Sequence, residues 1–243
     1  MRPEQREASM AEPARPSCPP PRVATQPPGR VALAWWWFAR GVVELVSRAL
    51  WRIEIRGREH LPASGAFVIA PVHRSNIDTL IASCLTRRRV RFMGKDTLWK
   101  YGWSGALLTS LGGFPVHRGA PDREALRVCE DAVRAGEPVV LFPEGTRQSG
   151  PSVQPLFEGA AFVAARAGVP IVPVGIGGSE WAMPKGERTV RLVKVVVVIG
   201  EPIVPPQRAP GARVPRREVA ELTDELRVRL QPLFDEALVA AGR

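Results

Sequence analysis

Short apolar runs alternate with segments of helical periodicity over most of the chain, from about residue 51 to the C-terminus. The apolar runs predict strands at Trp51–Ile55, Ala66–Ala70, Val90–Met93, Val139–Phe142, Ile171–Ile176 and Val193–Ile199. The helical patterns predict helices at Ile77–Thr86, Leu98–Thr109, Arg123–Ala135, Gly159–Ala167 and Arg216–Ala240, the last interrupted at Pro232. Strands that alternate with helices indicate a single-domain α/β fold, a mixed sheet flanked by helices, over residues 51–243.

The first 50 residues have a different pattern. Residues 1–30 are polar, rich in proline and without hydrophobic period, and we expect them to be disordered. Residues 31–50 read as an amphipathic helix whose consecutive tryptophans, 35–37, cannot all face one core, because a helix turns about 100° per residue. This helix either lies on a membrane surface, with Arg40 and Arg48 near the headgroups, or packs two of the tryptophans against its own domain.

No segment has the pattern of a membrane span or a signal peptide. The apolar run from Val31 to Val46 is interrupted by Arg40, Gly41 and Glu44, whereas a spanning helix needs about 20 mostly apolar residues. About thirty polar, Pro-rich residues precede the run, and no small-residue cleavage site follows it.

The formal net charge of +10 favours partners that carry phosphate. Only four of the 34 basic residues are lysines, a bias that a GC-rich bacterial genome would also produce. The three cysteines are widely spaced, so they predict neither a disulfide framework nor a zinc site and fit a reducing cytoplasm.

The segment PVHRSNIDTL, residues 71–80, follows a predicted strand and precedes a predicted helix. Ser75 and Asp78 have the S-x-x-D spacing of a helix capping box, in which Asp78 would only accept hydrogen bonds from backbone N–H groups. Alternatively, Asp78 meets one imidazole nitrogen of His73 and leaves the other nitrogen to take a proton from a hydroxyl. The segment by itself leaves both interpretations open.

Three later segments carry further candidate chemistry. GGFPVHRG, residues 112–119, offers Arg118 in a glycine-rich loop, and VVLFPEGTRQSG, residues 139–150, places a carboxylate and a guanidinium in one tight turn. That turn forms either a structural ion pair or a binding site for hydroxyls and phosphate. AGVPIVPVGIGG, residues 167–178, contains two prolines, which favour an edge strand or loop over a central strand. Its apolar residues suit either the wall of an acyl-chain pocket or a core strand.

H-x-x-x-x-D at 73–78, G-x-F-P-V-x-R ending at 118, F-P-E-G-T-R at 142–147 and V-P-I-V-P-V at 169–174 follow one another in this order. This order resembles the glycerolipid acyltransferase family, and within it the 1-acyl-glycerol-3-phosphate (lysophosphatidic acid) acyltransferases. The resemblance covers about residues 51–200 and implies a glycerol-3-phosphate acyltransferase-like fold. One departure is Phe157 with Glu158 ahead of Gly159, where many members carry a basic residue before the glycine.

The resemblance implies a role for each matching residue. His73 would be the general base and Asp78 its orienting partner. The acceptor phosphate and glycerol would be bound by Lys95, Arg118, Glu144, Gly145, Thr146 and Arg147. The acyl region would be shaped by Val169, Pro170, Ile171, Val172, Pro173 and Val174.

The implied reaction moves a fatty acyl group from acyl-CoA or acyl carrier protein to a lysophospholipid hydroxyl, giving phosphatidic acid. The thioester is attacked directly, so no cysteine nucleophile, metal or cofactor is expected. The expected partners are the acceptor lipid, the acyl donor and a membrane surface, without nucleic acid. The expected place is the cytoplasmic face of a bacterial membrane, in peripheral or monotopic attachment. Another polar-lipid acceptor, a thioesterase-like hydrolase and an inactive lipid- or CoA-binding module are the alternatives.

Overall fold

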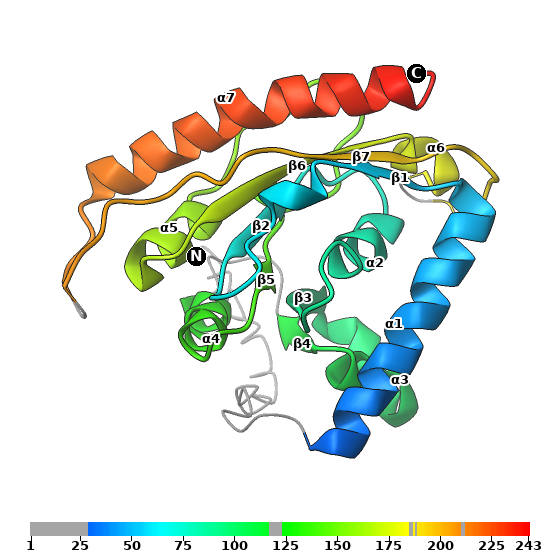
Figure 1. Ribbon diagram of the computed structural model, residues 1–243, viewed down its shortest axis with the longest axis horizontal. Coiled ribbons are helices and arrows are strands. Elements are labelled where there is room, and N and C mark those ends of the chain that lie inside the picture. The colour runs from blue at the N-terminus through cyan, green and yellow to red at the C-terminus, as the bar shows by residue number, and fades with distance from the viewer. Residues whose placement is uncertain (1–28, 117–122, 185–186, 188, 210–211) are drawn as a thin grey trace, which may run out of the picture.

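A seven-stranded sheet forms the centre of the computed structural model, which describes residues 29–116, 123–184, 187, 189–209 and 212–243 (Figure 1). The strands are β1 (Glu54–Arg56), β2 (Val68–Pro71), β3 (Arg91–Lys95), β4 (Gly113–Val116), β5 (Val139–Val140), β6 (Ile171–Gly177) and β7 (Val196–Ile199). Their spatial order is β1-β7-β6-β2-β5-β3-β4. All neighbours are parallel except β6 and β7, which are antiparallel. The predicted mixed α/β sheet is therefore confirmed.

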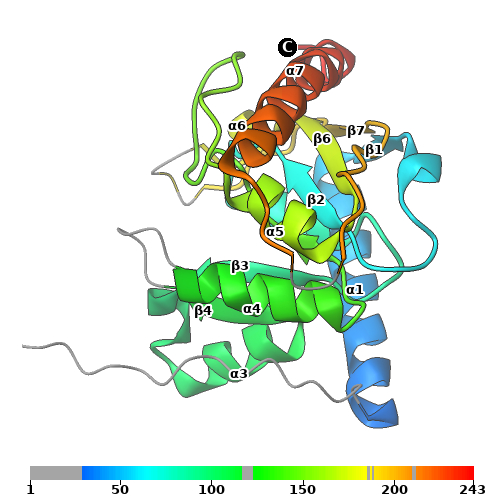
Figure 2. The ribbon, with the colours of Figure 1, turned by 90° about the vertical axis from the view of Figure 1, so that its left-hand side faces the viewer.

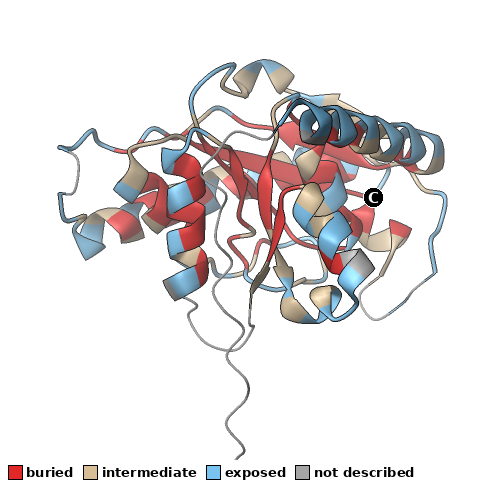
Figure 3. Ribbon diagram, turned by 90° about the horizontal axis from the view of Figure 1, so that it is seen from below, coloured by how far each residue is buried: buried red, intermediate tan, exposed pale blue. Residues whose placement is uncertain are grey.

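Helices cover both faces of the sheet (Figures 1 and 2). The helices are α1 (Arg30–Trp51), α2 (Ile77–Ser83), α3 (Gly102–Ser110), α4 (Arg123–Arg134), α5 (Gly159–Ala167), α6 (Ser179–Ala182) and α7 (Arg216–Ala240), with 3₁₀ turns η1 (Arg58–His60) and η2 (Asp96–Trp99). One face is covered by α4, α5 and α7, and the other by α2, against which α1 packs. Buried residues are concentrated in the strands between these layers, while the outer helix faces are exposed (Figure 3).

Helix α1 turns one face inward through Trp36, Arg40, Ser47 and Trp51, all of them buried. The neighbouring Trp35 and Trp37 are 43% and 44% exposed, so Trp36 alone of the three is buried, although the indole N–H of Trp35 donates to the Ser110 hydroxyl of α3. The placement of Arg40 near headgroups is wrong. Its guanidinium is buried and donates to the carbonyls of Thr86 and Cys84, which follow α2.

The two prolines of residues 167–178 do not mark an edge strand or loop. The alternative of a core strand is correct, because β6 is fully buried between β2 and β7. Pro173 is tolerated at a local irregularity of the ladder. Val174 pairs with Ile199, whereas Ile171 pairs with Ile203, so the β7 side has one extra residue just where proline lacks an N–H.

Several boundaries also differ from the sequence pattern, and the predicted helix Leu98–Thr109 is divided between η2 and α3. Trp51 ends α1 and does not begin a strand, and Pro232 lies inside α7 without interrupting it. Leu230 and Phe234, on either side of this proline, are buried, so packing offsets the missing helical hydrogen bond. Residues 113–116, predicted to lie in a glycine-rich loop, form strand β4. As an edge strand it accommodates Pro115.

Among the described residues, no helix has both the length and the apolar character needed to cross a membrane.

Candidate active site

The loops that carry the candidate residues meet at the carboxyl ends of β2 and β5. These two strands are parallel neighbours, so the chain leaves them at the same edge of the sheet. His73 follows β2 directly, and Phe142 and Glu144 follow β5. The tertiary fold therefore brings together segments that lie about 70 residues apart in the sequence.

His73 and Asp78 contact each other. Nδ1 of His73 lies 3.1 Å from Oδ2 of Asp78, and both side chains are buried. The same Oδ2 accepts the backbone N–H groups of Arg74 and Ser75, each at 2.6 Å. Asp78 therefore both closes the turn before α2 and faces the imidazole, so the two interpretations of this segment are compatible. The Ser75 hydroxyl donates to the carbonyl of Met183 (2.8 Å).

The imidazole of His73 is fixed by more than its aspartate. Its ring stacks on that of Phe142, with centroids 4.0 Å apart and planes 24° apart. Its backbone N–H donates to Oε2 of Glu144 (2.9 Å), and its carbonyl accepts the N–H of Gln148 (2.8 Å). With a proton on Nδ1 facing Asp78, Nε2 is the nitrogen left to accept a substrate proton.

Glu144 points inward, and its side chain is completely buried. Besides the hydrogen bond from the N–H of His73, its carboxylate accepts hydrogen bonds from Nη1 of Arg74 at 2.7 Å and from the N–H of Gln154 at 3.0 Å. Arg74 is 1% exposed. The only signal for Arg74 in the sequence is its place next to His73, which does not distinguish it from the other arginines.

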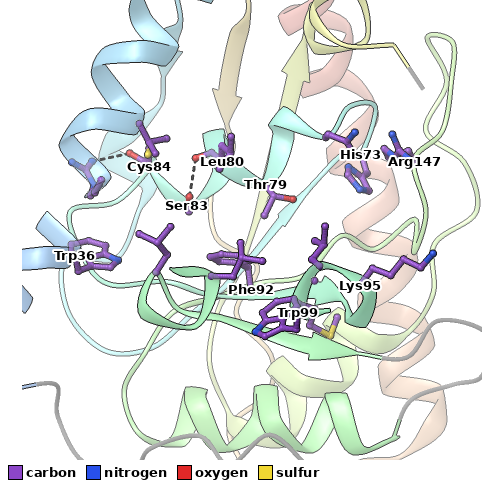
Figure 4. A pocket seen from close by; sticks show the side chains of 18 residues that line it. Trp36, His73, Thr79, Leu80, Ser83, Cys84, Phe92, Lys95, Trp99 and Arg147 are labelled. Atoms are coloured by element: carbon purple, nitrogen blue, oxygen red, sulfur yellow. Dashed lines mark hydrogen bonds between the residues drawn. The ribbon is translucent and has the colours of Figure 1, made fainter. Parts of the chain in front are cut away.

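An apolar cavity of about 470 Å³ extends from His73 between α2 and β3 (Figure 4). Its walls come from α1, α2, β3, η2 and α3. His73 and Arg147 lie at one end with Lys95 close by, and Trp36 and Cys84 lie at the other (Figure 4). Residues 169–174 are absent from the lining. They are intermediate to buried, mostly in β6, and their acyl role stays a prediction.

The predicted phosphate and glycerol residues are only partly brought together. Lys95, at the end of β3, and Arg147 both line the cavity beside His73. Gly145 and Thr146 lie in the exposed turn between Glu144 and Arg147, and Gly145 has a φ of 67° that favours glycine. The predicted Arg118 lies outside the described residues.

Neither a thiol nucleophile nor a metal cluster is evident among the described residues. Burial raises the pKa of the Cys84 thiol at the far end of the cavity, so this thiol stays protonated near neutral pH. Within the described ranges, no three His, Cys, Asp or Glu side chains are grouped so that they could hold a metal ion.

The chain is similar to known acyltransferases over most of its length. A family model described as Acyltransferase matches residues 52–177. The 1-acyl-sn-glycerol-3-phosphate acyltransferase of Bacillus subtilis is 28% identical over 81% of this chain and 95% of its own. The chloroplastic 1-acyl-sn-glycerol-3-phosphate acyltransferase of Brassica napus is 31% identical over 63% of this chain, but only 45% of its own length is covered.

A solved structure has the same fold. The 1-acyl-sn-glycerophosphate acyltransferase PlsC from Thermotoga maritima superimposes with a TM-score of 0.65 over 83% of this chain and 79% of its own, at 24% identity. The family match covers half of the chain, including the His73–Asp78 pair and the 142–147 turn. The chain therefore belongs to the acyltransferase family and is an O-acyltransferase.

Proposed function

We propose that the protein transfers a fatty acyl group from acyl-CoA or acyl carrier protein to the free hydroxyl of 1-acyl-glycerol-3-phosphate, forming phosphatidic acid. The observation that carries the proposal is the His73–Asp78 pair at the polar end of an apolar cavity, beside Lys95 and Arg147. A lysophospholipid and an acyl thioester both combine a long apolar chain with phosphate, which this arrangement suits.

The mechanism needs one base and no covalent enzyme intermediate. Nε2 of His73 takes the proton of the acceptor hydroxyl as its oxygen attacks the thioester carbonyl. Asp78 stabilises the imidazolium that forms, since its carboxylate already faces Nδ1 at 3.1 Å. The tetrahedral intermediate then expels the thiolate, which takes the proton back from His73.

The acceptor phosphate is assigned to the cationic end of the cavity. Arg147 supplies a planar fork of donors, and Lys95 adds a second positive charge. Arg118 is proposed as a further phosphate contact, and Gly145 and Thr146 as contacts to the glycerol. The acyl chain is assigned to the apolar part between α1, α2 and β3.

We also propose that the protein binds a membrane surface, at the cytoplasmic face, through α1. The outward face of this helix exposes an apolar stripe at helical spacing, made up of Val31, Trp35, Phe38, Val42 and Leu45. No charged residue lies among these five positions, and tryptophan and phenylalanine suit the membrane interface. The opposite face of α1 lines the cavity with Trp36 and Arg40, so a helix that lies on the membrane would hold the apolar cavity close to the lipid.

The test is to incubate the protein with labelled acyl-CoA and a panel of lysophospholipids and to identify the product lipid. We expect labelled phosphatidic acid from 1-acyl-glycerol-3-phosphate. His73→Ala should lower turnover by at least about 10²-fold, the usual contribution of a general base. The matched control is His60→Ala, because His60 lies in η1, bonded to the carbonyl of Ile199 and outside the cavity lining.

Other products would contradict the proposal in distinct ways. A different labelled phospholipid would change the acceptor and keep the reaction. Free labelled fatty acid without any acylated lipid would indicate a thioesterase-like hydrolase. Near-normal turnover by folded His73→Ala would remove His73 from its role as the base.

A further inference from the structure

We infer that Arg74 and Glu144 form a buried positioning pair that aligns His73, and that Glu144 acts through His73 instead of contacting the acceptor. The family resemblance assigns Glu144 to the glycerol, so this inference changes the role of a named residue. It rests on the proposed function in one respect, the use of His73 as the base.

Glu144 has no free face to offer a substrate. Its side chain is completely buried, and its two carboxylate oxygens already accept three hydrogen bonds. Oε2 accepts the N–H of His73 at 2.9 Å and Nη1 of Arg74 at 2.7 Å, while Oε1 accepts the N–H of Gln154 at 3.0 Å. The carboxylate therefore holds the backbone on both sides of the site.

Arg74 uses all three nitrogens of its guanidinium inside the protein. Nε donates to the carbonyl of Gly150 (3.2 Å), Nη2 to that of Ser152 (3.0 Å), and Nη1 to that of His73 (3.1 Å) as well as to Glu144. The ring of Phe234 in α7 lies 4.7 Å from the guanidinium carbon. Such a guanidinium cannot turn outward to a phosphate without leaving five polar and aromatic partners.

The pair joins the two loops on which the site is built. Arg74 belongs to the loop after β2, and Glu144 to the loop after β5, whose residues 150–154 are held by the same two side chains. His73 lies between them, with its N–H bonded to Glu144 and its carbonyl to Arg74. A shift of this backbone would move the imidazole away from Asp78 and from the acceptor hydroxyl, and a misplacement of about 1 Å can cost about 10²-fold in rate.

A double-mutant cycle in the full-length protein tests the inference with Arg74→Met, Glu144→Gln and the double variant. Turnover is divided by the folded fraction at the assay temperature, taken from unfolding curves. We expect each single variant to lower kcat by about 10²-fold, with the KM for the acceptor changed less than about threefold. The double variant should be no slower than the slower single variant, because the two side chains act as a unit.

A substrate-binding Glu144 would give the opposite pattern. Glu144→Gln would then raise the KM for the acceptor and leave kcat unchanged. In the double variant, the losses of kcat/KM from the two substitutions would multiply, to about 10⁴-fold. Either result overturns the inference. If a single variant does not fold, the double variant is measured instead, because it leaves no buried charge unpaired. A lower kcat with little change in the acceptor KM supports the inference, and a higher KM with unchanged kcat overturns it.

One readout needs no turnover and so remains decisive if the proposed function fails. The Hε1 proton resonance of His73, identified by its loss in His73→Ala, is sensitive to the stacked ring of Phe142. We expect it to shift in both single variants and in the double variant. The matched control is Glu180→Gln, which removes a carboxylate that also bonds the N–H of Gly150 but contacts neither His73 nor Arg74. An unchanged resonance in Glu144→Gln would overturn the inference.

Discussion

His73 is the residue on which the proposed chemistry depends, and four kinds of contact fix it. A carboxylate faces its ring nitrogen, an aromatic ring stacks on its face, and polar groups hold its backbone N–H and carbonyl. This leaves one ring nitrogen for the substrate. Positioning of this kind matters more to a general base than the identity of any single neighbour.

Arg147 is the residue whose loss should weaken acceptor binding most directly. We expect Arg147→Ala to raise the KM for 1-acyl-glycerol-3-phosphate by about 10- to 100-fold, the worth of one or two hydrogen bonds to a charged group. The KM for acyl-CoA should change less. Steady-state kinetics over both substrates measures the two effects.

Arg217→Ala is the matched control for Arg147→Ala, because Arg217 is an arginine on the exposed face of α7, paired with Glu221. Its kinetic constants should equal those of the wild type. An unchanged acceptor KM in Arg147→Ala would move the phosphate site to other cations.

At the scale of elements, the two faces of α1 have different roles. Its inner face closes the cavity with Trp36 and Arg40, and Arg40 also caps the carbonyls that follow α2. Its outer face carries the apolar stripe. Deleting the helix would therefore damage the cavity as well as the membrane contact, and only substitutions on the stripe separate the two.

We expect Phe38→Glu with Leu45→Glu to weaken sedimentation with anionic vesicles by at least about tenfold per residue. Burying a large apolar side chain is worth about 1.5–3 kcal/mol, and each charge opposes it. Both side chains are exposed, so turnover on detergent-dispersed substrate should persist. Vesicle binding equal to that of the wild type would show that the stripe does not bind the membrane. Sedimentation velocity would then test whether the stripe is covered by a second copy of the chain.

Val228→Glu is the control for the stripe variants. Val228 is an exposed apolar residue, but it lies on α7 and outside the stripe. Vesicle binding should be unaffected by this substitution.

At the scale of the whole molecule, the site depends on how closely α7 lies on the sheet. Strand β6 carries glycines at 175 and 177, under α7, where any side chain would collide with helix backbone. A Cβ on Gly175 would lie 2.3 Å from the carbonyl oxygen of Leu233, a distance that no rotamer change relieves. Phe234, next in α7, covers Arg74, so this contact extends to the active-site loops.

We expect Gly175→Ala to lower the free energy of unfolding by about 3 kcal/mol, at the upper end of overpacking costs, because α7 must move away from β6. Urea unfolding measures the change. The control is Gly41→Ala, a glycine inside α1 with nothing within 4 Å of the added carbon. That substitution should be neutral or stabilise by up to about 1 kcal/mol. A neutral Gly175→Ala would contradict the close packing.

The sequence itself determined the type of most elements and the order of the motifs. Apolar runs and helical periods are local properties, so the alternation of strands and helices and the long helix from Arg216 to Ala240 could be read directly. The spacing of His73 and Asp78 allowed their contact, but the segment by itself left a helix cap equally open, and the order of the four motifs favoured the catalytic pair.

Only the tertiary structure decided which way each side chain faces. Glu144 looked like a substrate ligand and is buried, Trp36 is buried between two exposed tryptophans, and Pro173 lies in a central strand. The cavity is lined by residues from several segments between positions 36 and 111, together with Arg147, and no local sequence pattern predicts it. The physical reason is that periodicity specifies an element's faces, whereas burial depends on partners that are distant in sequence and meet only when the sheet assembles.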